Sequence, residues 1–108
     1  MELKRVVVTG LGALTPVGNT VAETWENLVN GVSGAGPITH FDASKFKTQF
    51  ACEVKGFNGA DFIDRKEVRK MDLYTQYAIV AAKEAIADSE MDLEKEDLNK
   101  IGVIYGVG

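Results

Sequence analysis

Cys52 and His40 are the side chains best suited to nucleophilic or metal-assisted chemistry, and each residue type occurs once in the 108 residues. A nucleophilic cysteine needs a nearby base or cation that lowers its thiol pKa, and none stands beside Cys52. Phe50, Cys52 and Val54 instead alternate along one face of a predicted strand, which favours a buried structural thiol. One histidine and one cysteine cannot build a metal site, and His40 is expected to be a hydrogen-bonded surface residue. We therefore predict no catalytic residue, metal or cofactor within this chain.

The stretch VVVTGLGALTPVG at 6–18 has the look of a strand that runs into a nucleotide-binding glycine loop. A dinucleotide fingerprint requires G-x-G-x-x-G leading directly into a helix. Here Thr15 takes the place of the third glycine, and Pro16 keeps the chain irregular before the next helix. The phosphate-loop pattern G-x-x-x-x-G-K is absent as well. We predict that Gly10 and Gly12 form a tight turn after a strand, which argues against a nucleotide-binding α/β domain.

Four basic residues gather at the start of the longest predicted helix, over 64–89, within an arc of about 140°. They are Arg65, Lys66, Arg69 and Lys70. Cations at a helix N-terminus oppose the macrodipole, each by about 0.3–1 kcal/mol when exposed. Four acidic residues within 61–72 balance them, so a salt-bridged solvent face is one interpretation. A surface that binds an acidic partner is the other.

The elements that must position these residues alternate between strand and helix, which favours an α/β fold with parallel strand pairs. Consecutive valines predict a strand buried on both faces, and Thr20 with Glu23 has the spacing of a capping box. The expected elements are a strand at 6–8, a helix from 20 to a stop at Gly31, a loop at 34–41, a strand at 48–55, a helix at 64–89 and a strand at 101–108.

Composition sets the broad class of the protein. With 45% hydrophobic and 26% charged residues, the chain has the size and balance of one ordinary globular domain. A net charge of −4 predicts no nucleic-acid partner, and no apolar run is long enough for a signal peptide or membrane span. A single cysteine excludes an internal disulfide and favours a cytoplasmic setting. The buried-type strand at 101–108, without a polar tail or following helix, is expected to continue into a longer protein.

Four blocks, with their spacing, carry a resemblance that covers nearly the whole chain. They are RVVVTGLGALTPVGNTV at 5–21, ITHFDASKF at 38–46, FACEVKGFN at 50–58 and DRKEVRKMDLYTQYAIVAAKEAIADS at 64–89. Together they resemble the opening of the β-ketoacyl-acyl carrier protein synthases, and in particular the elongating enzymes of the synthase II type. The resemblance identifies residues 1–108 as the N-terminal part of the N-terminal domain of such an enzyme.

The resemblance implies a partial thiolase-like fold, in which α/β/α layers stack, and a homodimeric enzyme. The activity it implies is elongation of fatty acyl chains by decarboxylative Claisen condensation with malonyl-acyl carrier protein. The family uses one cysteine nucleophile and two histidines, all of which lie in later motifs. This segment is therefore expected to be inactive alone.

The resemblance also gives the basic helix start a role. By matched position, Lys66, Arg69 and Lys70, with Arg65 beside them, correspond to a docking surface for acyl carrier protein. Two alternatives stay open at this point. One is a non-catalytic interaction module that uses residues 65–70, and the other is a chain-length-factor or polyketide relative, since such proteins share these opening motifs.

Overall fold

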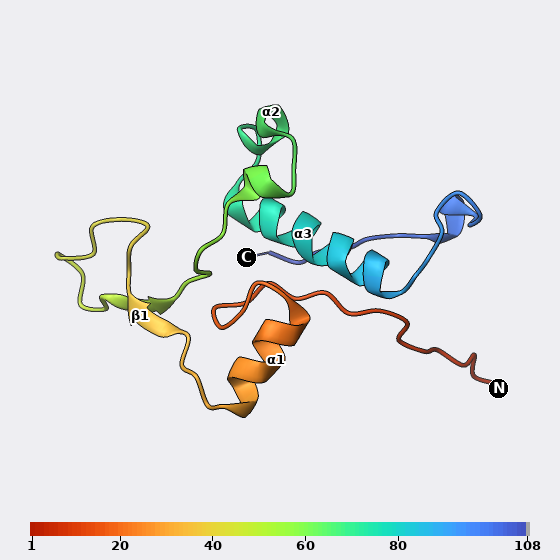
Figure 1. Ribbon diagram of the computed structural model, residues 1–108, viewed down its shortest axis with the longest axis horizontal. Helices are drawn as coiled ribbons and strands as arrows, with labels where there is room; N and C mark the ends of the chain where they lie inside the picture. Colours follow the sequence, from red (N-terminus) through yellow and green to blue (C-terminus); the bar gives the residue numbers. More distant parts are fainter. Residues whose placement is uncertain (108) are drawn as a thin grey trace.

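The computed structural model describes residues 1–107 as a set of short elements joined by long connections (Figure 1). The helices are α1 (Val21–Val29), α2 (Arg65–Val68) and α3 (Leu73–Asp88), and the strands are β1 (Ala35–Pro37) and β2 (Phe50–Cys52). Two 3-10 turns, η1 (Gly59–Asp61) and η2 (Leu98–Lys100), complete the elements of the described chain. Helix α3 is the longest element, and the glycine-rich segment before α1 crosses its C-terminal half.

The chain is open rather than compact. Its radius of gyration is 17.1 Å, whereas a compact domain of this length has a value of about 13 Å. Ala43 and Val80 are the buried hydrophobic residues of the described chain, at 8% and 6% exposed. Large apolar side chains therefore lie on the surface, among them those of Val6, Trp25 and Phe50.

Helix α1 begins and ends as the sequence predicts. The Thr20 hydroxyl accepts a hydrogen bond from the Glu23 amide at 3.2 Å, and the Glu23 carboxylate accepts one from the Asn19 amide at 3.2 Å. The first bond is the hydroxyl half of a capping box, whereas the Glu23 carboxylate bonds to the residue before the cap and not to the Thr20 amide. After the helix, Gly31 has a φ of 68°, a left-handed conformation that glycine adopts without steric penalty.

Gly10 and Gly12 serve close packing against α3. A Cβ atom at Gly12 would collide with the carbonyl oxygen of Ala81, and one at Gly10 with that of Ala85. Backbone can approach a helix this closely only where side chains are absent. The two glycines therefore form a contact surface for α3 and not the predicted tight turn after a strand; the turn in this segment lies at 16–17, between Thr15 and Gly18.

Two carboxylates of α3 fasten the same segment. Glu84 accepts hydrogen bonds from the amides of Ala13 and Val21, at 3.0 and 2.8 Å. One turn later, Asp88 accepts a bond from the amide of Leu11 at 2.9 Å. Charge-assisted bonds of this kind are stronger than bonds between neutral groups, so they hold the segment against the helix.

The β1–β2 pair corrects four predictions. The strands are antiparallel, with Ala35 opposite Cys52 and Pro37 opposite Phe50, so the predicted loop at 34–41 contains a strand and the described pairing is not parallel. The predicted strand at 48–55 is limited to β2. Cys52 is exposed rather than buried, because two strands alone leave both faces of the hairpin uncovered within residues 1–107.

The valine run at 6–8 and the described part of the segment predicted at 101–108 form no strands; residue 108 lies outside the described residues. Val7 is 61% exposed and Val103 is 64% exposed. A strand is defined by hydrogen bonds to a neighbour, and no neighbouring strand pairs with either segment in the described chain. The predicted strands at 6–8 and 101–107 are therefore absent from the sheet of the described residues, which consists of β1 and β2.

The predicted helix over 64–89 is two helices. Helix α2 ends at Val68, and Asp72 adopts an extended conformation (φ −69°, ψ 159°) immediately before α3. Asp72 occupies the position before the first helical turn, where aspartate is common, but its side chain makes no capping hydrogen bond, and no proline or glycine interrupts the sequence here. Arg65 and Lys66 consequently lie on α2, and Arg69 and Lys70 lie in the turn that follows it.

Lys55 joins three segments of the chain. Its ammonium group donates hydrogen bonds to the carbonyl oxygens of Pro16 at 3.0 Å, Gly34 at 2.8 Å and Glu53 at 3.0 Å. All three donors of the ammonium group are thus used. Asn19 returns a bond to the Lys55 carbonyl at 2.9 Å, which ties the glycine segment to the β-hairpin.

Candidate functional site

The basic residues predicted for partner binding lie on and just after α2, which is set off the axis of α3 (Figure 1). The carboxylate of Asp64 accepts a hydrogen bond from the Lys66 amide at 2.8 Å and so starts the helix. Arg65, Lys66, Arg69 and Lys70 are all exposed. We call these four residues the basic patch.

The members of the basic patch differ in their charge pairing. Lys70 forms an ion pair with Glu67 at 3.1 Å. Arg65, Lys66 and Arg69 form no salt bridge with any of residues 1–107. Since an exposed pair contributes at most about 1 kcal/mol, Lys70 can exchange Glu67 for a better acidic partner. The patch therefore offers three uncompensated cations and one weakly held cation.

Aromatic contacts brace the segment that leads into α2. The Phe57 ring stacks on Phe62 with centroids 6.0 Å apart and meets Tyr77 of α3 edge-on at 5.1 Å. Lys83, also on α3, donates a hydrogen bond to the Phe62 carbonyl at 2.9 Å. Burial raises the pKa of the Tyr77 hydroxyl, and the negative charge of Glu53 adds to the rise. The uncharged phenol suits this apolar contact.

Gln76 links α2 to α3 directly. Its side-chain amide donates hydrogen bonds to the carbonyl oxygens of Met71 at 3.2 Å and Val68 at 3.5 Å. Gln76 was missed in the sequence analysis, which treated 64–89 as one helix and left no helix end there to be capped. The available signal was an amide within an otherwise apolar stretch, because a buried amide requires hydrogen-bond partners.

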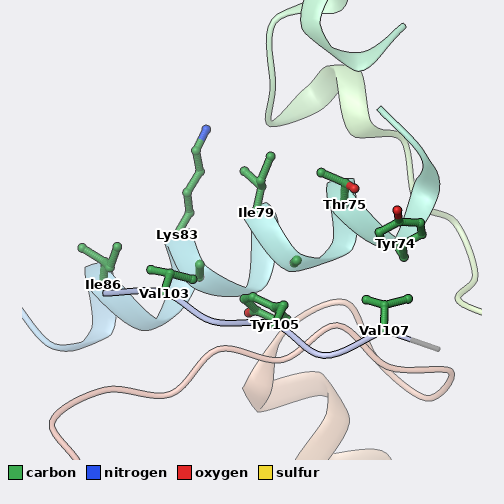
Figure 2. A pocket seen from close by; sticks show the side chains of 10 residues that line it. Tyr74, Thr75, Ile79, Lys83, Ile86, Val103, Tyr105 and Val107 are labelled. Carbon is green, nitrogen blue, oxygen red and sulfur yellow. The ribbon is translucent and has the colours of Figure 1, made fainter. Parts of the chain in front are cut away.

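An apolar groove of about 470 Å³ runs between α3 and the segment at 103–107 (Figure 2). Val103, Tyr105 and Val107 lie along one side of it, and Tyr74 and Ile86 mark its two ends on α3. No carboxylate, histidine or cysteine lines the groove. It provides mainly apolar contact area, and its polar lining side chains are those of Tyr74, Thr75, Lys83 and Tyr105.

The structure places the other sequence candidates at the surface. His40 is exposed, as predicted, and its backbone amide donates to the Glu53 carboxylate at 3.3 Å. The same carboxylate accepts bonds from the Thr39 amide at 2.9 Å and the Thr39 hydroxyl at 2.7 Å. These bonds hold the pKa of Glu53 below its ordinary value, with the hydroxyl of Thr39 as the largest cause. Glu53 thus fixes the turn that carries His40.

No group of three or more histidine, cysteine, aspartate or glutamate side chains gathers within residues 1–107 in a way that could hold a metal ion. Among the helices of that range, none has both the length and the apolar character needed to cross a bilayer.

Comparison with known sequences assigns the class of protein. The profile of the family described as "Beta-ketoacyl synthase, N-terminal domain" matches residues 3–108. Because the match spans nearly the whole chain, the chain belongs to the β-ketoacyl synthase family, as the sequence motifs predicted.

Two curated relatives are similar to nearly the whole chain. The chain is 50% identical over 105 residues to 3-oxoacyl-acyl-carrier-protein synthase 2 of Staphylococcus aureus strain COL, covering 97% of the chain and 25% of that protein. It is 46% identical over 108 residues to the synthase 2 of Synechocystis sp., covering 100% of the chain and 26% of that protein. The chain thus spans about a quarter of the length of the curated relatives it matches.

Solved structures give the same family. The ishigamide ketosynthase/chain length factor matches with a TM-score of 0.74 and 36% identity, over 82% of this chain and 22% of that one. The AntDE ketosynthase, in complex with the type II polyketide acyl-carrier protein AntF, matches with a TM-score of 0.69 and 31% identity, over 91% and 24% of the two chains. The open arrangement of elements is therefore similar to a corresponding part of larger ketosynthases.

Proposed function

We propose that this chain is the N-terminal part of a condensing enzyme that elongates fatty acyl chains on acyl carrier protein. The observation that carries the proposal is 50% identity to a 3-oxoacyl-acyl-carrier-protein synthase 2 over 97% of the chain. In the longer protein, the segments at 6–8 and 101–107 would become strands of a layered α/β/α thiolase-like fold. A cytoplasmic homodimer is part of the same proposal.

The proposed reaction requires groups that residues 1–108 do not supply. In the family, a cysteine thiolate accepts the acyl group from its carrier, with release of the carrier thiol. Malonyl carrier then loses carbon dioxide, and its carbanion equivalent attacks the acyl thioester, which forms the new carbon–carbon bond and frees the cysteine. Histidines and backbone amides stabilise the developing charges. Within the chain, Cys52 lies on an exposed strand and is assigned no part in this chemistry.

The role proposed for this segment is docking of the carrier through the basic patch. Exposed, uncompensated cations attract an acidic partner and accelerate its association. Arg65, Lys66 and Arg69 have this character, and Lys70 joins them when it leaves Glu67. A related ketosynthase is known in complex with an acyl-carrier protein, which supports the choice of partner.

Charge reversal in the full-length enzyme tests this role. The double variant Lys66→Glu, Arg69→Glu should raise KM for acyl-carrier substrates by about tenfold or more, because a close interfacial charge pair is worth about 1.5 kcal/mol or more. Turnover at saturating substrate should change little. The measurement is steady-state condensation at low ionic strength.

The matched control is Lys45→Glu, Lys47→Glu, which makes the same charge change in the exposed loop between β1 and β2, away from α2 (Figure 1). This control should leave KM near its original value. Equal effects of the two double variants would show that net charge alone matters and would remove the docking role from α2.

A chain-length-factor-like protein is the second candidate, since one similar structure contains a chain length factor. Such a relative would present the same N-terminal elements without condensing activity. Formation or absence of an elongated β-ketoacyl product by the full-length protein separates the two candidates.

A further inference from the structure

We propose that Gln76 is a positioning residue that sets the orientation of the basic patch for its partner. The proposal rests on the proposed function, in that it explains how the docking element is held. Gln76 itself lies on α3, and it acts through α2 rather than by touching the partner.

Gln76 is unusual in its burial. It is 6% exposed and is the buried polar residue of the described chain. Its amide donates to the carbonyl oxygens of Met71 and Val68, at 3.2 and 3.5 Å, which lie at the end of α2 and in the turn that follows. Burying an amide is favourable only when it is hydrogen-bonded, so this side chain is committed to those carbonyl groups.

The space for this amide depends on Gly59. A Cβ atom at Gly59 would collide with the Gln76 side-chain oxygen. Gly59 is itself buried, and the Val68 side chain lies 3.5 Å from the position of such a Cβ. The backbone of η1, the end of α2 and the Gln76 amide therefore form one packed joint.

This joint lies where the chain turns off the axis of α3, between the basic patch and the first turn of α3. The last carbonyl groups of a helix have no partner within it. No proline or glycine lies between Arg65 and Asp88, and the Asp72 side chain makes no capping bond. At the break, Gln76 donates to the carbonyl oxygens of Met71 and Val68, and the Val68 carbonyl also accepts a bond from the Met71 amide at 3.2 Å. Arg69, within this turn, is fixed relative to α3 by the same bonds.

The test replaces the amide in the full-length enzyme with a side chain of similar length that cannot donate. Gln76→Met should raise KM for acyl-carrier substrates about threefold to tenfold, the loss expected for hydrogen bonds of this kind. Values of kcat, and the rate with a carrier-free acyl-pantetheine thioester, should stay unchanged. A purely structural role would instead lower turnover of both substrates together.

Gln49 provides the matched control. Its side-chain amide also donates to two carbonyl oxygens, those of Ser44 at 3.3 Å and Phe46 at 3.2 Å, in the loop between β1 and β2. Gln49→Met should therefore leave KM unchanged. A second variant, Gly59→Ala, displaces the Gln76 amide without removing it and should reproduce the rise in KM. It carries the test if Gln76→Met does not fold.

Hydrogen exchange separates this proposal from the docking role itself. In the carrier-free enzyme, Gln76→Met should speed exchange of the amides at 66–71 and leave those of the C-terminal half of α3 unchanged. Unchanged exchange at 66–71 would overturn the positioning role. The role would also fail if Gln76→Met speeds exchange without changing KM, while Lys66→Glu, Arg69→Glu does raise KM. If the charge reversals leave KM unchanged but exchange still rises, the docking role fails and only the structural link from Gln76 to α2 remains.

Discussion

Single carboxylates hold several backbone segments of this chain in place by accepting two or more hydrogen bonds each. Glu53 accepts hydrogen bonds from the hydroxyl and amide of Thr39 and from the amide of His40. Glu84 accepts hydrogen bonds from the amides of Ala13 and Val21. In both cases an ionised oxygen satisfies donors that no strand or helix takes up. The function of these residues is therefore to shape loops rather than to transfer protons.

Glu53 gives a pH prediction at the residue scale. Its pKa in the folded protein lies below the ordinary value of 4.5 because its bonds from Thr39 and His40 favour the ionised form. The stabilisation is complete above pH 4.5 and is lost as pH falls through the lower, folded-state pKa. Exchange of the Thr39 amide, corrected for its intrinsic pH dependence, should rise on acidification in the full-length protein.

Glu53→Gln should remove this acid dependence, because the amide cannot change charge. Asp42→Asn is the control, since Asp42 has a pKa lowered by Ser44 and makes no bond to Thr39. Acid-dependent exchange at Thr39 that persists in Glu53→Gln would assign the effect to another group.

At the scale of elements, the glycine segment packs closely on α3, whereas the segments at 6–8 and 101–107 pair with no strand of the described chain. Gly12 to Ala81 and Leu11 to Asp88 are contacts between residues far apart in the sequence. Such contacts exist only after the chain has folded, so local periodicity cannot reveal them. The break before Asp72 was missed for a related reason, since the apolar pattern of a helix continues across it.

Gly12→Ala should destabilise the full-length protein by about 1–3 kcal/mol, because the added methyl group meets backbone atoms of α3 that cannot yield without a shift of the helix. Gly36→Ala is the matched control, as a Cβ atom there has no neighbour within 4 Å. Urea denaturation of both variants measures the difference. Equal midpoints would contradict the close approach of the glycine segment to α3.

At the scale of the whole molecule, sequence reasoning recovered the family but only part of the architecture. The Thr20 cap of α1 was predicted correctly because its bond to the Glu23 amide joins residues within one helical turn, although the Glu23 carboxylate bonds to Asn19 and not to Thr20. The predicted strands at 6–8 and 101–107 are absent from the structure, because a strand requires a partner and no strand of the described chain pairs with these segments. The four cationic residues of the basic patch are visible in the sequence, whereas their placement on and just after a separate α2, and the link to Gln76, depend on tertiary contacts.

The open shape follows from the same lack of partners. A radius of gyration of 17.1 Å and widespread exposed apolar side chains agree with a chain that spans about a quarter of its relatives. We expect the groove on α3 and the valine run to be covered in the longer enzyme. Carrier docking by α2 remains a prediction that the kinetic variants test.

The most direct test of condensing activity is an incubation of the full-length protein with acyl-loaded acyl carrier protein and malonyl carrier. Mass spectrometry of the carrier then identifies the product. The account predicts a β-ketoacyl carrier whose chain is two carbons longer, formed with release of carbon dioxide. A folded full-length protein that binds the carrier but forms no elongated product would contradict the condensing activity and favour a chain-length-factor-like relative.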